Sequence, residues 1–450
     1  MSEYQYNKVT PEMIEKFKEI APKRVLVGDE INEDFTHDEM AIYGKARPEV
    51  LVEATSTEEV AAVVKLCNEN KVPVTPSGAR TGLVGGAVSI GGGVMISLTK
   101  MNKILGYDKE NFVVKIQSGV LLNDLAQDAE KQGLLYPPDP GEKFATVGGN
   151  VATNAGGMRA VKYGCTRDYV RAMTVVLPTG EIVKLGATVS KTSSGYSLLN
   201  LMIGSEGTLG IITELTLKVI PAPKSVISLI IPYENLEDCI ATVPQFFMHH
   251  LAPQALEFME KEVVMDTEKF LGKQVYPKEL EGTEIGAYLL ATFDGNSEEQ
   301  LEDIIEQASE VVLEAGAIDV DTVLLDECDV VVPTNKIAEF LTYTKSLEAE
   351  ADFRVKSFGH AGDGNLHIYT CSNDMEEGEF KKQVAVFMDK VYAKATEFGG
   401  MISGEHGIGH GKMDYLAESL GPVQMRIMEG VKEVFDPNMI LNPGKICYKL

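Results

Sequence analysis

The first 220 residues alternate between apolar residues at helical spacing and short apolar runs that are typical of strands. The capping box Ser56-x-x-Glu59 precedes apolar residues three or four positions apart and predicts a helix that ends near Lys71. A proline at a first helical position predicts another helix from Pro11, and a terminal glycine closes a third at 123–133. Short strands are expected at 72–74, 173–177, 182–185 and 210–219.

The segment Pro221-Ala222-Pro223 interrupts this pattern and is interpreted as a linker. Beyond it, strands are predicted at 226–231, 286–293, 318–325 and 330–332, and helices at 235–248, 297–316 and 380–392. No glycine-rich phosphate loop precedes these helices, so this half is predicted to be a smaller α+β domain. Alternation of both element types along the whole chain predicts an α/β or α+β protein.

Length and composition narrow the class of protein. With 450 residues, 44% of them hydrophobic and 24% charged, the chain has an ordinary globular composition and is long enough for two to three domains. Its net charge of −26 argues against nucleic acid or an anionic membrane as a partner. The sequence has no stretch of about 20 uninterrupted apolar residues, which a membrane span requires. A polar N-terminus and six cysteines without a C-x-x-C pair favour the cytoplasm.

Three segments are unusually rich in glycine and small polar residues. They read Pro-Ser-Gly-Ala-Arg-Thr-Gly at 76–82, Thr-Val-Gly-Gly-Asn-Val-Ala-Thr-Asn-Ala-Gly-Gly at 146–157 and Gly-Ser-Glu-Gly-Thr-Leu-Gly at 204–210. Consecutive backbone amides can form a nest for phosphate oxygens, and small residues let a flat ligand lie against the backbone. Neither the Walker pattern nor G-x-G-x-x-G occurs in them. A tight multi-turn loop without a ligand is the alternative for the first segment.

Four of the seven histidines fall in the window 360–410. His360 and His367 flank a Gly-Asp-Gly turn that folds the two flanks together, and Glu405-His406 lies among glycines shortly before His410. Two histidines and a glutamate suit Zn²⁺, Fe²⁺ or Mn²⁺ with positions left open for a substrate. Incidental histidines in two surface loops are the alternative.

Together with Tyr-Gly-Cys-Thr-Arg-Asp-Tyr at 163–169, these motifs resemble the vanillyl-alcohol-oxidase-type (PCMH-type) flavoproteins, and within them the glycolate oxidase D-subunit and D-lactate dehydrogenase branch. The resemblance extends from residue 40 to the C-terminus. It implies an α+β fold with an FAD-binding domain at 1–222, whose core is 46–222. It further implies an α+β, ferredoxin-like cap domain for substrate and metal at 223–410, and a segment at 411–450 that returns to the FAD domain.

The resemblance implies that the FAD pyrophosphate binds at 77–82 and the isoalloxazine near 146–157 and 206–212. The residues expected to contact FAD are Pro76, Ser77, Gly78, Ala79, Arg80, Thr81, Gly82, Pro140, Thr146, Gly149, Asn150, Thr153, Asn154, Gly156, Glu206, Gly207, Ile212 and Asn442. Relatives with covalent flavin carry a histidine in the first loop, where this chain has Ala79 and Arg80. Noncovalent FAD is therefore expected.

By the same resemblance, His360, His367 and Glu405 are expected to bind one divalent metal, with His406 as the catalytic base and His410 as its rival. The implied reaction is oxidation of a D-2-hydroxy acid, foremost D-lactate, to the 2-oxo acid, with hydride transfer to the flavin. Glycolate and D-2-hydroxyglutarate are alternative substrates. A metal-dependent hydrolase of a nucleotide and a non-catalytic electron-transfer subunit are alternatives of other classes.

Other residues are candidates to support the metal or to bind the substrate carboxylate. Asp363 and Asn365 are candidates to orient the ligating imidazoles. Relatives hold the carboxylate with an arginine before a D-V-x-V-P motif and with a lysine. Here Glu327 occupies the lysine position and the stretch for the arginine is missing. The basic candidates nearby are Lys336, Arg354 and Lys356.

The motif Asp-Glu-Cys-Asp-Val-Val-Val-Pro at 326–333 resembles lactate dehydrogenases of anaerobes that reduce an electron-transferring flavoprotein. Such a flavoprotein is accordingly the expected electron acceptor.

Overall fold

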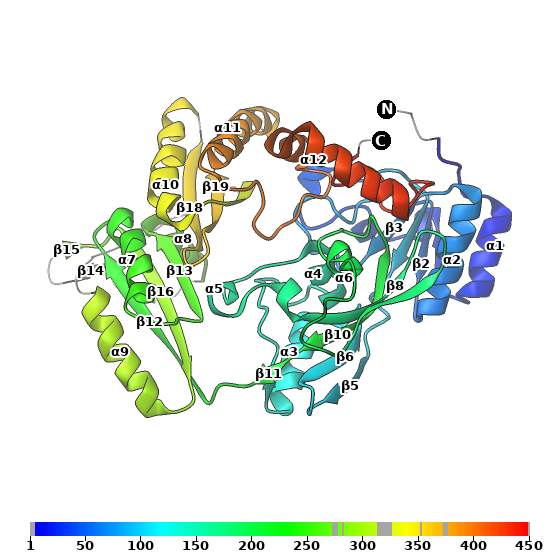
Figure 1. Cartoon of the computed structure of the whole chain (residues 1–450). Helices are drawn as coiled ribbons and strands as arrows, with labels where there is room; N and C mark the ends of the chain where they lie inside the picture. The colour runs from blue at the N-terminus through cyan, green and yellow to red at the C-terminus, as the bar shows by residue number, and fades with distance from the viewer. Residues whose placement is uncertain are drawn as a thin grey trace. The chain divides into compact units, whose positions relative to one another are not determined.

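A computed structural model describes residues 5–271, 278–280, 283–312, 326–351, 353–371 and 377–448 (Figure 1). The chain divides into two compact units. The first unit consists of Met1–Ala155, Cys165–Ala222 and His406–Leu450, and the second of Gly156–Gly164 and Pro223–Glu405. The predicted strand 318–325 and the end of the predicted helix 297–316 lie outside the described residues. Within the described ranges, no helix is both long and apolar enough to cross a membrane.

One sheet of the first unit has four strands in the order β1-β2-β4-β3. Their bounds are Val25–Val27 (β1), Val50–Glu53 (β2), Val94–Ser97 (β4) and Val74–Ser77 (β3). β2, β4 and β3 are parallel to one another, and β1 is antiparallel to β2. Helices α1 (Pro11–Ile20) and α2 (Thr57–Asn70) share a hydrophobic core with these strands, as the apolar spacing of α2 predicted for that helix.

A second sheet of the first unit has the order β5-β6-β10-β8-β9 and is antiparallel throughout. Its strands are Ile104–Asp108 (β5), Val113–Gln117 (β6), Ile211–Lys218 (β10), Val170–Val176 (β8) and Ile182–Gly186 (β9). The other elements are α3 (Leu122–Lys131), α4 (Val147–Thr153), α6 (Leu198–Met202), α12 (Met413–Phe435) and the pair β7 (Leu134–Leu135) with β11 (Ile220–Pro221). After α12, the chain returns to β3, where Val74 N donates to Ile440 O and Asn442 N to Val74 O.

The second unit is built on a six-stranded antiparallel sheet in the order β12-β16-β13-β18-β19-β17. Its strands are Ser225–Tyr233 (β12), Ala287–Gly295 (β16), Ala255–Glu260 (β13), Arg354–His360 (β18), Asn365–Cys371 (β19) and Asp326–Val331 (β17). Its helices are α5 (Ala160–Tyr163), α7 (Leu236–Met248), α8 (Lys261–Leu271), α9 (Glu298–Val312), α10 (Ile337–Ser346) and α11 (Glu377–Glu397), and β14 (Glu279–Leu280) pairs with β15 (Thr283–Glu284).

Most predicted elements are present, but several boundaries are shifted, including the starts of β3, α3, β8, β17 and α11. β3 begins at Val74 rather than Val72, because Val72 N still donates to Cys67 O at the end of α2. Helix α3 begins at Leu122, one residue before the predicted start, with Leu121 as its N-cap. Strands β13, β18 and β19, which build the site described below, were not predicted.

Candidate cofactor and metal sites

The three glycine-rich segments meet in the first unit. A Cβ atom on Gly207 would lie 2.4 Å from Pro76 Cγ, and one on Gly78 would lie 2.3 Å from Thr146 Oγ1. Glu206 N also donates to Ala152 O at 2.8 Å. Segments that are distant in sequence therefore form one continuous surface of backbone and small residues, with no room for larger side chains between them.

Several residues expected to contact FAD have unusual backbone conformations. Arg80, Asn154, Glu206 and Asn442 have φ values of 64°, 55°, 49° and 42°, respectively. Left-handed conformations of residues other than glycine are uncommon and cluster at ligand sites. Asn154 is the C-cap of α4, where this conformation is usual, so Arg80, Glu206 and Asn442 are the positions that fit a ligand site.

This surface retains unused hydrogen-bonding groups. Among the described residues, Ser118 Oγ and Asn442 Oδ1 are buried without a partner. Ser118 lies against Gly148, where a Cβ would be 2.5 Å from Ser118 Cβ, while Asn442 Nδ2 donates to Glu206 O at 2.7 Å. A cofactor such as FAD, rich in donors and acceptors, fits a surface of exposed backbone and unpaired polar atoms.

Some side chains expected at FAD have roles within the fold. Arg80 stacks on Phe35, with its guanidinium carbon 3.9 Å from the ring centroid, and donates to Asp34 O. Thr146 caps α4 by accepting the Gly149 N–H, and Asn154 Oδ1 accepts the Arg167 N–H at 3.0 Å. At these positions the backbone is thus better placed to contact a ligand than the side chain.

In the second unit, the structure brings together His360, His367 and Glu405. β18 and β19 form a hairpin around the Gly-Asp-Gly turn and hold the two histidines on one face of the sheet. Their Nε2 atoms lie 3.2 Å (His360) and 3.3 Å (His367) from Glu405 Oε1, and their rings are nearly perpendicular at 89°. One ligand atom from each of the three residues lies within 4.8 Å of the others.

Glu257, which sequence reasoning missed, orients His360. It lies on β13 directly opposite His360, and its carboxylate is 2.7 Å from Nδ1. An imidazole held in this way directs Nε2 at the centre of the site. Asp363 instead accepts the Asn365 N–H and shapes the turn. The sequence signal that could have revealed Glu257 is its position as an acidic residue within the otherwise apolar segment Ala255–Phe258.

The electrostatics of the cluster favour a cation at its centre. Burial lowers the pKa of His360, but hydrogen bonds with Glu257 and Glu405 outweigh it and raise that pKa to about 11. Burial raises the pKa of Glu405, but both imidazoles outweigh it and lower that pKa to about 2. In the described part of the chain, Glu405 Oε2 is buried without a hydrogen-bond partner. Two imidazoles and this carboxylate fit a divalent metal, which would take the place of the protons.

The remaining candidates differ in their surroundings. His406 directly follows Glu405 and is half-buried, whereas His410 is exposed and its backbone N–H donates to Val84 O at 2.9 Å. Lys336 pairs with Glu339 at 2.5 Å, while Lys356 is only 3% exposed. By strand alternation, Lys356 lies on the same face of β18 as His360.

One short segment belongs to the second unit, although the segments before and after it in the sequence belong to the first. Residues 156–164 follow α4 and include α5. A Cβ on Gly156 would lie 3.0 Å from Glu405 Oε2, and one on Gly362, in the turn between the histidines, would lie 2.3 Å from Val161 Cγ2. Tyr163 OH donates to Asp294 at 2.7 Å. The end of the second glycine-rich motif therefore packs directly on Glu405.

Comparison with known proteins first gives the class. Residues 48–186 match the family "FAD binding domain", and residues 222–327 and 321–446 match "FAD linked oxidases, C-terminal domain". The structure is similar to that of p-cresol methylhydroxylase with substrate bound, with a TM-score of 0.74, 17% identity and 98% of each chain covered. The protein is an FAD-dependent oxidoreductase with the expected PCMH-type α+β fold, which removes the hydrolase alternative.

Relatives then identify the family. The chain is 94% identical to a D-lactate dehydrogenase of Anaerostipes hadrus over 100% of both chains, and 35% identical to glycolate oxidase subunit GlcD of Bacillus subtilis over 90% of each. It belongs to the FAD-linked 2-hydroxy acid dehydrogenases, as its motifs predicted.

One difference from the Anaerostipes hadrus relative is internal. The alignment with the Anaerostipes hadrus protein spans 475 positions, 25 more than the 450 residues of this chain. The two matches to the C-terminal family overlap at 321–327, beside the place where the sequence predicted a missing arginine-bearing stretch. Residues 313–325 lie outside the described part, so the absence of the arginine-bearing stretch stays a prediction.

Proposed function

We propose that this protein uses FAD and one divalent metal to oxidise D-lactate to the 2-oxo acid. The observation that carries the metal role is the convergence of His360 Nε2, His367 Nε2 and Glu405 Oε1, with Glu257 behind His360. The substrate is supported by the 94% identical relative, which is a D-lactate dehydrogenase. Glycolate is the second candidate because of the GlcD relative, and D-2-hydroxyglutarate remains an alternative.

Each residue has a proposed task in this reaction. His360, His367 and Glu405 hold the metal, and Glu257 keeps the His360 ring in place. When bound, the metal acts as a Lewis acid on the substrate hydroxyl and FAD accepts a hydride. His406 takes the hydroxyl proton, so that proton and hydride together account for the two-electron oxidation. Lys356, buried on the same strand face as His360, is the basic group proposed for the substrate carboxylate.

FAD binding is proposed to be noncovalent and to use the surface made by 76–82, 146–157, 204–212 and Asn442. The support is that these segments pack on one another and leave Ser118 Oγ and Asn442 Oδ1 without partners among the described residues. Acid precipitation tests the linkage. A colourless pellet with yellow supernatant is expected, whereas yellow colour in the pellet would contradict noncovalent binding.

An electron-transferring flavoprotein is the proposed electron acceptor. The support is the resemblance of the 326–333 motif to lactate dehydrogenases that use such a partner. The test is D-lactate-dependent reduction of a purified electron-transferring flavoprotein, followed by its absorbance. Failure to reduce it, while artificial dyes are reduced, would exclude this acceptor.

Anaerobic flavin bleaching at about 450 nm tests the reaction itself. D-Lactate, L-lactate, glycolate and D-2-hydroxyglutarate are mixed separately with the FAD-loaded protein. We expect D-lactate to bleach the flavin fastest and a chelator to abolish bleaching while leaving the yellow FAD bound. Flavin that no hydroxy acid reduces would indicate the non-catalytic electron-transfer alternative, and bleaching that survives chelation would refute the metal role.

A further inference from the structure

The loop that carries both Glu405 and His406 has little structure of its own. Residues 403–409 contain three glycines, and Gly407 and Gly409 have φ values of 83° and 48°, in the left-handed region. Glycine is the most flexible residue, so such a loop does not by itself fix the side chains it carries. Glu405 is the last residue of the second unit and His406 begins the final segment of the first, so each unit must hold its own part of the loop.

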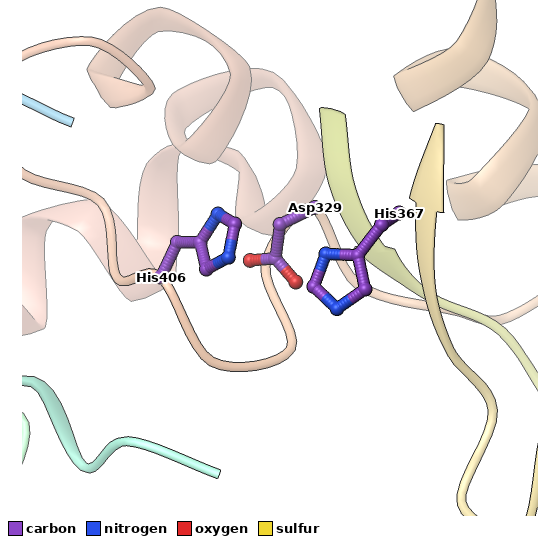
Figure 2. A group of neighbouring side chains, drawn as sticks. All are labelled: Asp329, His367 and His406. Atoms are coloured by element: carbon purple, nitrogen blue, oxygen red, sulfur yellow. The ribbon is translucent and has the colours of Figure 1, made fainter. Parts of the chain in front are cut away.

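In the second unit, Asp329 holds the start of the loop. Its side chain is fully buried on β17, directly opposite His367 on β19, and Figure 2 shows these two side chains together. The carboxylate accepts Ser403 Oγ–H at 2.6 Å, Gly404 N–H at 3.1 Å and Glu405 N–H at 3.4 Å. One carboxylate thus ties the strand that pairs with His367 to the turn that presents Glu405.

In the first unit, Glu206 holds the end of the loop. Its buried carboxylate accepts Ile408 N–H and Gly409 N–H, each at 2.7 Å. Gly407 lies so close that a Cβ there would be 2.8 Å from Glu206 Oε1. Burial raises the pKa of Glu206, while these two amides and the nearby Lys445 and Lys412 oppose that shift. Glu206 was expected to contact FAD, and its carboxylate is instead occupied by the backbone next to His406.

We infer that Asp329 and Glu206 are positioning residues: Asp329 fixes Glu405 for the metal, and Glu206 fixes His406 for proton transfer. The inference rests on the proposed function for the roles of Glu405 and His406. A buried carboxylate that is satisfied by backbone amides is a rigid attachment, because removing it leaves those amides unsatisfied. Ligand positioning of this kind typically changes metal affinity about 10- to 100-fold.

The Asp329 part is tested by metal titration of the FAD-loaded, metal-free Asp329→Asn protein. Asparagine keeps one acceptor oxygen but turns an NH₂ group towards the N–H donors. We expect the metal Kd to rise about 10- to 100-fold, with unchanged flavin absorbance and with turnover recovering at saturating metal. Glu260→Gln is the control, since Glu260 is partly exposed in the same sheet and accepts Ser357 Oγ–H. An unchanged metal Kd in Asp329→Asn would overturn the inference.

The Glu206 part is tested with Glu206→Gln, which lacks the charge and one of the two acceptors. We expect kcat to fall about 100-fold, with KM, metal Kd and FAD content nearly unchanged and with an altered pH profile of kcat. The control is Glu59→Gln, which breaks an ion pair with Arg24 elsewhere in the first unit. Loss of FAD, or a normal kcat and pH profile, would overturn the inference.

These outcomes are separable from failure of the proposed function. If the wild-type protein oxidises no hydroxy acid, the proposed function fails. The metal Kd of Asp329→Asn, measured by binding alone, still decides whether Asp329 positions Glu405.

Discussion

The two units prepare their sites by opposite means. In the first unit, the expected FAD surface is made of backbone, glycine and small side chains, and its loops approach so closely that Gly78 and Gly207 have no room for a Cβ. In the second unit, the site consists of side-chain heteroatoms presented by neighbouring strands of one sheet, with His360, His367 and Glu257 on β18, β19 and β13. The first site depends on glycine positions that lack side-chain atoms, and the second depends on imidazole and carboxylate groups that converge.

This difference predicts which amino-acid substitutions each unit tolerates. Adding an atom in the first unit forces packed backbone segments apart. Removing an atom in the second unit leaves a charged or polar partner buried and unsatisfied. His406→Ala, Glu257→Gln and Gly148→Ala are therefore expected to act mainly on turnover, metal affinity and FAD occupancy, respectively.

Replacing the proposed base is expected to have the largest effect. His406→Ala removes the proton acceptor, and a positioned acid–base group contributes about 10²- to 10⁴-fold to kcat. FAD content and metal content are expected to stay the same, so steady-state kinetics on the fully loaded protein measures the loss. His410→Ala is the matched control because His410 is exposed. A large loss in His410→Ala with near-normal His406→Ala would exchange the two roles.

Glu257→Gln is expected to weaken the metal site without changing its ligands. The amide cannot match the charged hydrogen bond to His360 Nδ1, so the ring is less well held and the metal Kd rises about 10- to 100-fold. Metal content after dialysis at defined free metal concentrations measures this effect, with FAD absorbance unchanged. Glu237→Gln on the exposed surface of α7 serves as the control. Equal metal retention in both variants would mean that Glu257 does not support a metal ligand.

Adding one methyl group tests the first unit. A Cβ on Gly148 would lie 2.5 Å from Ser118 Cβ and 2.7 Å from Ser118 O, whereas nothing lies within 4 Å of one on Gly141. Gly148→Ala is expected to lower the free energy of unfolding by about 1–3 kcal/mol and to reduce FAD occupancy. Gly141→Ala is expected to change neither. Thermal unfolding and the ratio of flavin to protein absorbance measure both, and equal behaviour of the two variants would show that close approach is unimportant here.

A pH-dependent change in stability is the smallest expected effect. Burial raises the pKa of Asp38 to about 6, although the Gly85 and Gly86 amides and Lys445 oppose the shift. The folded state therefore binds this proton more tightly than the unfolded state, and the charged Asp38 reduces stability increasingly as the pH rises from 4 to 6. Asp38→Asn removes this dependence, so its stability relative to wild type should be about 1 kcal/mol more favourable at pH 7 than at pH 5. Urea unfolding at both pH values measures it, and a pH-independent difference would contradict the shifted pKa.

Local features of the sequence predicted much of the fold. Ser56 caps α2 as its capping box indicated, and α2 ends at Asn70, next to the predicted end near Lys71. Helix α1 begins at Pro11 as predicted, with Thr10 as its N-cap. Asn235 likewise caps α7, whose helical range was predicted within one residue. These signals are readable because a cap or turn depends on hydrogen bonds among residues three or four positions apart.

The candidate site was predictable only in part. His360 and His367 are close because one tight turn joins β18 to β19, so their spacing in sequence carried the information. Glu257 comes from a strand more than 100 residues away, and its place opposite His360 depends on the order and register of β13 and β18. A register shift of one residue would turn Glu257 to the other face of the sheet.

The sequence by itself determined the types of group at each site: glycine-rich loops for a flat cofactor and a histidine–glutamate set for the proposed metal. The tertiary structure alone decided how these groups are held. It placed Asp329 and Glu206 at the two ends of the 403–409 loop and packed the 156–164 segment against Glu405. The physical reason is that turns and caps form from neighbouring residues, whereas contacts between distant segments form only when strand register and core packing of a whole unit are satisfied.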